Sequence, residues 1–78
     1  MNYIATFYTQ AAALLTNREL KSRGVSCKAG PVPRELSSSC GTCVHYTADS
    51  PMLNVLDADI ESVYEITSKG YRLVMHHD

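Results

Sequence analysis

The fold is decided by one stretch, residues 9–24, which reads TQAAALLTNRELKSRG. From Gln10 onward its alanines, leucines and long charged side chains are strong helix formers. Thr9 can cap the first turn through its hydroxyl, and Gly24 can end the helix after a basic last turn. This stretch therefore predicts one well-defined helix.

The apolar residues of this helix predict which side faces a core. At 3.6 residues per turn, five side chains share one side of the helix and are expected to pack on a sheet, whereas Leu14 points outward. The five expected core-facing residues are Ala12, Ala13, Leu15, Thr16 and Leu20.

The rest of the chain is predominantly β-forming. Segments rich in β-branched and aromatic residues predict strands at 3–8, 25–29, 42–47, 60–67 and 71–75. Ser50 and Pro51 resemble the start of a second, short helix that would reach about Leu56. The expected order is β-α-β-β-α-β-β, which is an α+β fold with a single small mixed or antiparallel sheet and helices on one face, ferredoxin-like or related.

Size and composition set limits on function. The chain has 78 residues, which is one domain (1–78), and its net charge of −1 offers little attraction to nucleic acid. The longest uninterrupted apolar run, Ala11–Leu15, is too short to span a bilayer. Three unevenly spaced cysteines do not resemble a secreted disulfide scaffold, so we expect a soluble cytoplasmic protein with no membrane or nucleic-acid partner.

The candidate site is the segment PRELSSSCGTC, residues 33–43. Serines before Cys40 and a glycine after it predict a polar turn with accessible backbone N–H groups, which stabilise a thiolate. Arg34 could add positive charge. A reactive thiol is one reading of Cys40, and a small buried hydrophobe is the other.

Cys40 and Cys43 also form a C-x-x-C motif, which permits a disulfide or half of a zinc site. The residues after Cys43 continue as a strand, whereas a thioredoxin-like site would continue as a helix. His45 shares a strand face with Cys43, so zinc held by Cys40, Cys43 and His45 is an alternative. No cofactor is otherwise expected.

The run VPRELSSSCG at residues 32–41 resembles a small bacterial family called putative selenium/sulfur carrier protein-like. The early aromatic Phe7 and the Ala-rich helix that closes on Gly24 extend this resemblance over roughly residues 3–47. The resemblance implies a carrier rather than a stand-alone enzyme, with Cys40 holding a persulfide or selenopersulfide from a cysteine desulfurase or a sulfurtransferase-like protein. Cys43 stands where the resemblance implies an apolar residue, so it is either an added resolving thiol or metal ligand, or a packing substitution.

These observations combine into a leading hypothesis with two rivals. In the leading one Cys40 bears the persulfide, Cys43 is a possible resolving thiol, and Arg34, Ser39, Gly41 and Thr42 help to bind the cargo. The rivals are a non-enzymatic protein-binding or adaptor domain and the small zinc-stabilised module described above. An open edge of a small sheet also allows a homodimer.

Overall fold

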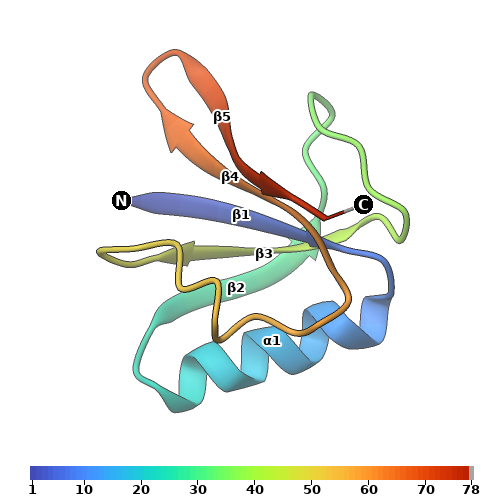
Figure 1. Cartoon of the computed structure of the whole chain (residues 1–78), viewed down its shortest axis with the longest axis vertical. Coiled ribbons are helices and arrows are strands. Elements are labelled where there is room, and N and C mark those ends of the chain that lie inside the picture. Colours follow the sequence, from blue (N-terminus) through green and yellow to red (C-terminus); the bar gives the residue numbers. More distant parts are fainter. Residues whose placement is uncertain (78) are drawn as a thin grey trace.

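The computed structural model describes residues 1–77 and contains one helix and five strands within them (Figure 1). The neighbouring strands are all antiparallel, in the order β2-β3-β1-β4-β5. The predicted α+β fold with one small antiparallel sheet is thus confirmed. The elements are β1 (Asn2–Phe7), α1 (Gln10–Ser22), β2 (Ser26–Pro31), β3 (Thr42–Thr47), β4 (Ile60–Thr67) and β5 (Gly70–His76).

Helix α1 begins and ends as its sequence predicts. The Thr9 hydroxyl accepts a hydrogen bond from the Ala12 amide at 3.1 Å, which satisfies one of the free donors of the first turn. Gly24 adopts a left-handed φ of 77°, a conformation that costs glycine little. The helix closes at Ser22 because the chain must turn back at this glycine to begin β2.

The buried side of α1 is narrower than expected. Four of the five expected residues are buried, but Leu15 is 52% exposed, as is Leu14, which was expected to point outward. Leu15 lies at the flank of the apolar stripe. The segment before β4 reaches this side of α1, where the Asp57 amide donates to the Thr16 hydroxyl at 3.1 Å, but it leaves Leu15 largely uncovered. The residues of α1 that are buried are Ala12, Ala13, Thr16 and Leu20.

The core lies between α1 and one face of the sheet (Figure 1). Alternate residues of β1 point to this face, and Tyr3 stacks on Tyr46 of β3 with ring centroids 5.3 Å apart. The helix contributes Leu20, and β4 contributes Val63, both fully buried. The small side chains of Ala12 and Ala13 are buried between the helix and the sheet, so this core is thin.

The expected second helix, from Pro51 to about Leu56, is wrong. Met52 has a left-handed φ of 53°, which interrupts any helix there, and only a single turn forms, with the Val55 amide donating to the Met52 carbonyl at 2.9 Å. The Tyr46 hydroxyl donates to the Pro51 carbonyl at 2.5 Å. Six residues are too few for a helix that local propensity alone must hold. The order is therefore β-α-β-β-β-β, which lacks the second helix of a ferredoxin-like layout.

The face of the sheet opposite α1 carries a row of polar and sulfur side chains. Cys43 of β3 lies opposite Thr6 of β1, Thr6 lies opposite Ser62 of β4, and Ser62 lies opposite His76 of β5. Cys43 and Thr6 are fully buried, and Ser62 is 3% exposed. The row crosses the end of the sheet at which the loop between β2 and β3 lies.

None of the helical segments in residues 1–77 has the length and hydropathy needed to cross a membrane.

Candidate functional site

The candidate site is the loop of residues 32–41, which joins β2 to β3 (green in Figure 1). Its base is closed by the Val32 amide, which donates to the Gly41 carbonyl at 3.1 Å. An inner turn forms where the Leu36 amide donates to the Pro33 carbonyl at 3.0 Å. The loop is therefore an ordered element that begins and ends at one point of the sheet.

Cys40 lies at the end of this loop and is half-buried against the core cluster. Its thiol donates to the Thr42 carbonyl at 3.5 Å. Gly41 between them has a left-handed φ of 75°, so the chain turns sharply after Cys40 before it enters β3. The turn leaves the thiol at the rim of the sheet, partly open to solvent.

Cys43, three residues later, is in a different environment. It is fully buried, and its thiol donates to the Pro31 carbonyl at 3.5 Å. Burial, together with the nearby charge that Cys40 carries when ionised, raises the pKa of the Cys43 thiol to about 11. At neutral pH this thiol is protonated and unreactive, since the thiolate is the nucleophilic form.

Cys27, the third cysteine, is distant from the loop along the edge strand β2. Its thiol donates to the Asn17 carbonyl at 3.4 Å. Burial raises the pKa of Cys27, and Lys21 partly offsets this effect. Cys27 is thus a structural thiol between α1 and the sheet.

The expected cargo-binding residues occupy different places. Ser39 directs both its amide and its hydroxyl to the carboxylate of Glu61, so neither group points into an empty site. Gly41 is exposed, and Thr42 is half-buried as the first residue of β3. Arg34 is exposed and forms no ion pair within residues 1–77, so its charge is available at the loop surface.

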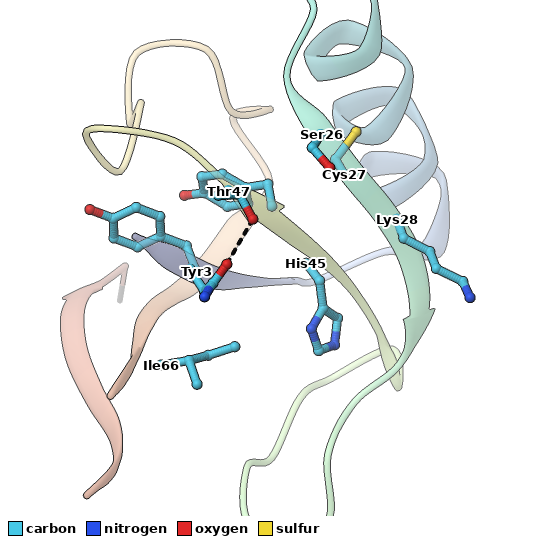
Figure 2. Close-up of a pocket in the computed structure, with 9 residues that line it drawn as sticks. Tyr3, Ser26, Cys27, Lys28, His45, Thr47 and Ile66 are labelled. Atoms are coloured by element: carbon cyan, nitrogen blue, oxygen red, sulfur yellow. Dashed lines mark hydrogen bonds between the residues drawn. The ribbon is translucent and has the colours of Figure 1, made fainter. Parts of the chain in front are cut away.

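The zinc alternative gains no support from the geometry. Within residues 1–77 no three His, Cys, Asp or Glu side chains lie close enough together to hold a metal ion, so Cys40, Cys43 and His45 do not form such a group. His45 of β3 instead lies opposite Lys28 of β2 and points to the face of the sheet opposite α1 (Figure 2). Cys43 lies on that face as well but is buried.

A hollow of about 220 Å³ lies on the face of the sheet opposite α1, between the edge strand β2 and β4 (Figure 2). Its lining includes Lys28, His45 and Ile66, but neither Cys40 nor Cys43. The cysteine loop and the hollow are therefore separate features of the surface.

The residue that sequence reasoning missed is Glu61. Its carboxylate accepts from the Ser39 amide at 3.0 Å and from the Ser39 hydroxyl at 3.4 Å, across 22 positions in the chain. No local pattern around Glu61 could have indicated this contact, because it exists only once β4 is paired beside β1.

Comparison with known proteins supplies one match. A search of curated proteins and a search of solved structures both find nothing that matches. A family model matches residues 2–65, a range that holds the whole cysteine loop and extends beyond the resemblance seen in the sequence. Because this match spans most of the chain, the chain belongs to the family described as Putative Se/S carrier protein-like.

Proposed function

We propose that this protein carries sulfur or selenium on Cys40 as a persulfide or selenopersulfide. The description of the family supports a carrier role in general. The observation that carries the assignment to Cys40 is the contrast within the C-x-x-C motif, because Cys40 is partly exposed at the end of an anchored loop whereas Cys43 is fully buried.

The transfer that we propose is a thiol exchange without net oxidation. The Cys40 thiolate attacks the terminal sulfur of a persulfide on a donor protein, such as a cysteine desulfurase or a sulfurtransferase-like protein. The S–S bond of the donor breaks, the donor cysteine leaves as a thiolate, and a new S–S bond forms on Cys40. Transfer to an acceptor thiolate repeats the same step in the forward direction, which returns Cys40 to its thiolate.

In this proposal Cys43 does not resolve the persulfide. A resolving thiolate would attack the sulfur of Cys40, form a disulfide between the two cysteines and release the cargo as hydrosulfide. The raised pKa of Cys43, about 11, keeps that thiol protonated at neutral pH and so disfavours this loss. The burial of Cys43 would therefore preserve the cargo.

Two further features support the chemistry. The exposed Arg34 guanidinium lies in the same loop and can offset the negative charge of a persulfide, and the amides of the Cys40-Gly41-Thr42 turn can donate to it. We place this chemistry in the cytoplasm, where thiols stay reduced.

The test is sulfur loading by a cysteine desulfurase. The reduced protein is incubated with the enzyme and cysteine, and intact mass spectrometry should then find a gain of one sulfur atom. Cys40→Ser should abolish the gain, whereas the matched variants Cys27→Ser and Cys43→Ser should keep it. Selenocysteine in place of cysteine tests selenium as the cargo in the same assay.

A gain that persists in Cys40→Ser would overturn the proposal. A gain that disappears in Cys43→Ser, while Cys43→Ser stays folded by circular dichroism, would show instead that the buried thiol takes part in the transfer.

A further inference from the structure

Glu61 of β4 forms hydrogen bonds with the loop that carries Cys40. Its two carboxylate oxygens accept hydrogen bonds from Ser39, the residue directly before Cys40, at 3.0 Å from the amide nitrogen and 3.4 Å from the hydroxyl. Bonds to an ionised acceptor are stronger than those between neutral groups. Ser39 is therefore held at both its backbone and its side chain.

Glu61 is itself held in place by the sheet. It is the second residue of β4, and the next residue, Ser62, is paired with Thr6 of the central strand. The Glu61 carbonyl also accepts a hydrogen bond from the His77 amide at 2.8 Å, which ties the end of β5 to the same point. The carboxylate thus projects from a fixed backbone.

Among the described residues, no ion pair involves the carboxylate of Glu61. The ion pairs within residues 1–77 join Arg23 to Glu19 and Arg72 to Glu65, and neither includes Glu61. Its hydrogen bonds in the described part of the chain go to Ser39. A second tether lies next to this one, because the Ser38 hydroxyl donates to the Phe7 carbonyl at 3.3 Å.

We propose that Glu61 is the positioning residue of the Cys40 thiol: by accepting both hydrogen bonds of Ser39, its carboxylate fixes the loop so that Cys40 is held half-buried at the rim of the sheet. This role rests on the proposed carrier function of Cys40. Glu61 acts through Ser39, to which its carboxylate is bonded.

Loss of the Glu61 carboxylate should change two reactions of Cys40 in opposite directions. When the carboxylate is lost, the loop is free to open, so Cys40 is exposed more often to small reagents in solution. Transfer from a donor protein needs the thiol at a defined place, and misplacement slows such a reaction. A variant with a loosened loop should therefore react faster with a small alkylating agent and more slowly with a protein donor.

The experiment compares Glu61→Ala, Glu61→Gln and Ser39→Ala with the unchanged protein. The glutamine keeps an oxygen that can accept from the Ser39 amide, and Ser39→Ala removes only the weaker hydroxyl bond. Glu65→Gln is the matched control, because it makes the same change on the same strand but breaks only the ion pair with Arg72. Alkylation by iodoacetamide is followed at each cysteine by peptide mass spectrometry, and sulfur loading by the desulfurase assay.

In Glu61→Ala we expect Cys40 alkylation to rise about fivefold and sulfur loading to fall about tenfold, the size of effect that loss of a charge-assisted tether produces. Glu61→Gln and Ser39→Ala should lie between this variant and the unchanged protein, and Glu65→Gln should match the unchanged protein. Alkylation of Cys43 should not change, because the sheet around it stays intact.

Unchanged Cys40 alkylation in Glu61→Ala would overturn the positioning role. An equal change in Glu61→Gln and Glu65→Gln would also overturn it, because it would assign the effect to a loss of negative charge on β4 and not to the bonds with Ser39. If Glu61→Ala does not fold, which alkylation of all three cysteines would reveal, Glu61→Gln and Ser39→Ala decide the question. The alkylation arm needs no sulfur transfer, so a failure of the carrier function appears separately, as an absence of loading in the unchanged protein.

Discussion

At the scale of single residues, the two cysteines of the C-x-x-C motif differ because of strand register. Cys43 is the second residue of β3 and lies opposite Thr6 of the central strand on one side and Gly30 of β2 on the other. Its side chain is fully enclosed there. Cys40 precedes the strand and the left-handed Gly41, so it stays at the rim. Two thiols only three positions apart therefore differ in exposure: Cys40 is partly exposed and Cys43 is fully buried.

The burial of Cys43 predicts a loss of stability at alkaline pH. The thiol has a pKa raised from 9.0 to about 11 in the folded protein, so its contribution to stability is complete below pH 9 and is lost as pH rises towards 11. Each pKa unit is worth about 1.4 kcal/mol, so the rise from 9.0 to about 11 is worth about 2.8 kcal/mol in total. The free energy of unfolding should fall by about 2 kcal/mol of this between pH 9 and pH 11. Urea unfolding under reducing conditions at several pH values measures it.

The matched variant for this prediction is Cys43→Ala. Each protein is compared with its own stability at pH 8, so the cost of the small cavity cancels. Cys43→Ala should lose less stability with rising pH, although a part remains because burial also raises the pKa of Tyr46. An alkaline loss of the same size in both proteins would contradict the role of Cys43.

At the scale of elements, α1 depends on its N-cap more than a helix with a wide apolar face would. Its buried stripe consists of two alanines, a threonine and one leucine, which bury little apolar area. Loss of the Thr9 hydroxyl would leave the Ala12 amide without its partner at the start of the helix. The termini of α1 are thus important to its stability.

We predict that Thr9→Ala lowers the free energy of unfolding by about 1 kcal/mol, the usual cost of removing an N-cap hydroxyl. Thr9→Ser keeps the hydroxyl and should stay close to the unchanged protein. Urea unfolding followed by circular dichroism compares the three proteins. An equal loss in Thr9→Ser would attribute the effect to the methyl group and not to the cap.

At the scale of the whole molecule, the first strand of the chain is the centre of the sheet. β1 pairs with both β3 and β4, although it precedes both in the sequence, and the edges are β2 and β5. The cysteine loop, residues 32–41, is attached to the sheet by hydrogen bonds at two places. Ser38 bonds to Phe7 at the end of β1, and Ser39 bonds to Glu61 near the start of β4. The position of Cys40 therefore depends on the assembly of the complete sheet.

This arrangement predicts an order of hydrogen exchange. The three inner strands β3, β1 and β4 each have a strand on both sides, and amides of β1 should exchange slowest because it lies at the centre, farthest from both edges. The outward amides of the edge strands β2 and β5 should exchange earlier. Within the loop, the Ser39 amide should be protected relative to its neighbours by its bond to Glu61. Exchange measured by NMR tests this order, and slowest exchange in β5 would contradict the sheet order.

The sequence by itself determined the local features of this protein. The capped helix from Gln10, the strands at 42–47 and 60–67 and the hairpin at Gly70 follow from propensity, capping and turn chemistry, which act over a few residues. Cys40 as the thiol of interest followed from its loop and from the resemblance to a family that the match over residues 2–65 confirms.

The tertiary structure alone decided what depends on contacts between distant segments. Residues 51–56 carry the signals of a helix start, but Met52 turns left-handed and Pro51 accepts a bond from Tyr46, so no helix forms. The burial of Cys43 and the hydrogen bonds between Ser39 and Glu61 both require β1 to lie between β3 and β4. Pairing register joins residues tens of positions apart, and no short pattern in the sequence records that register.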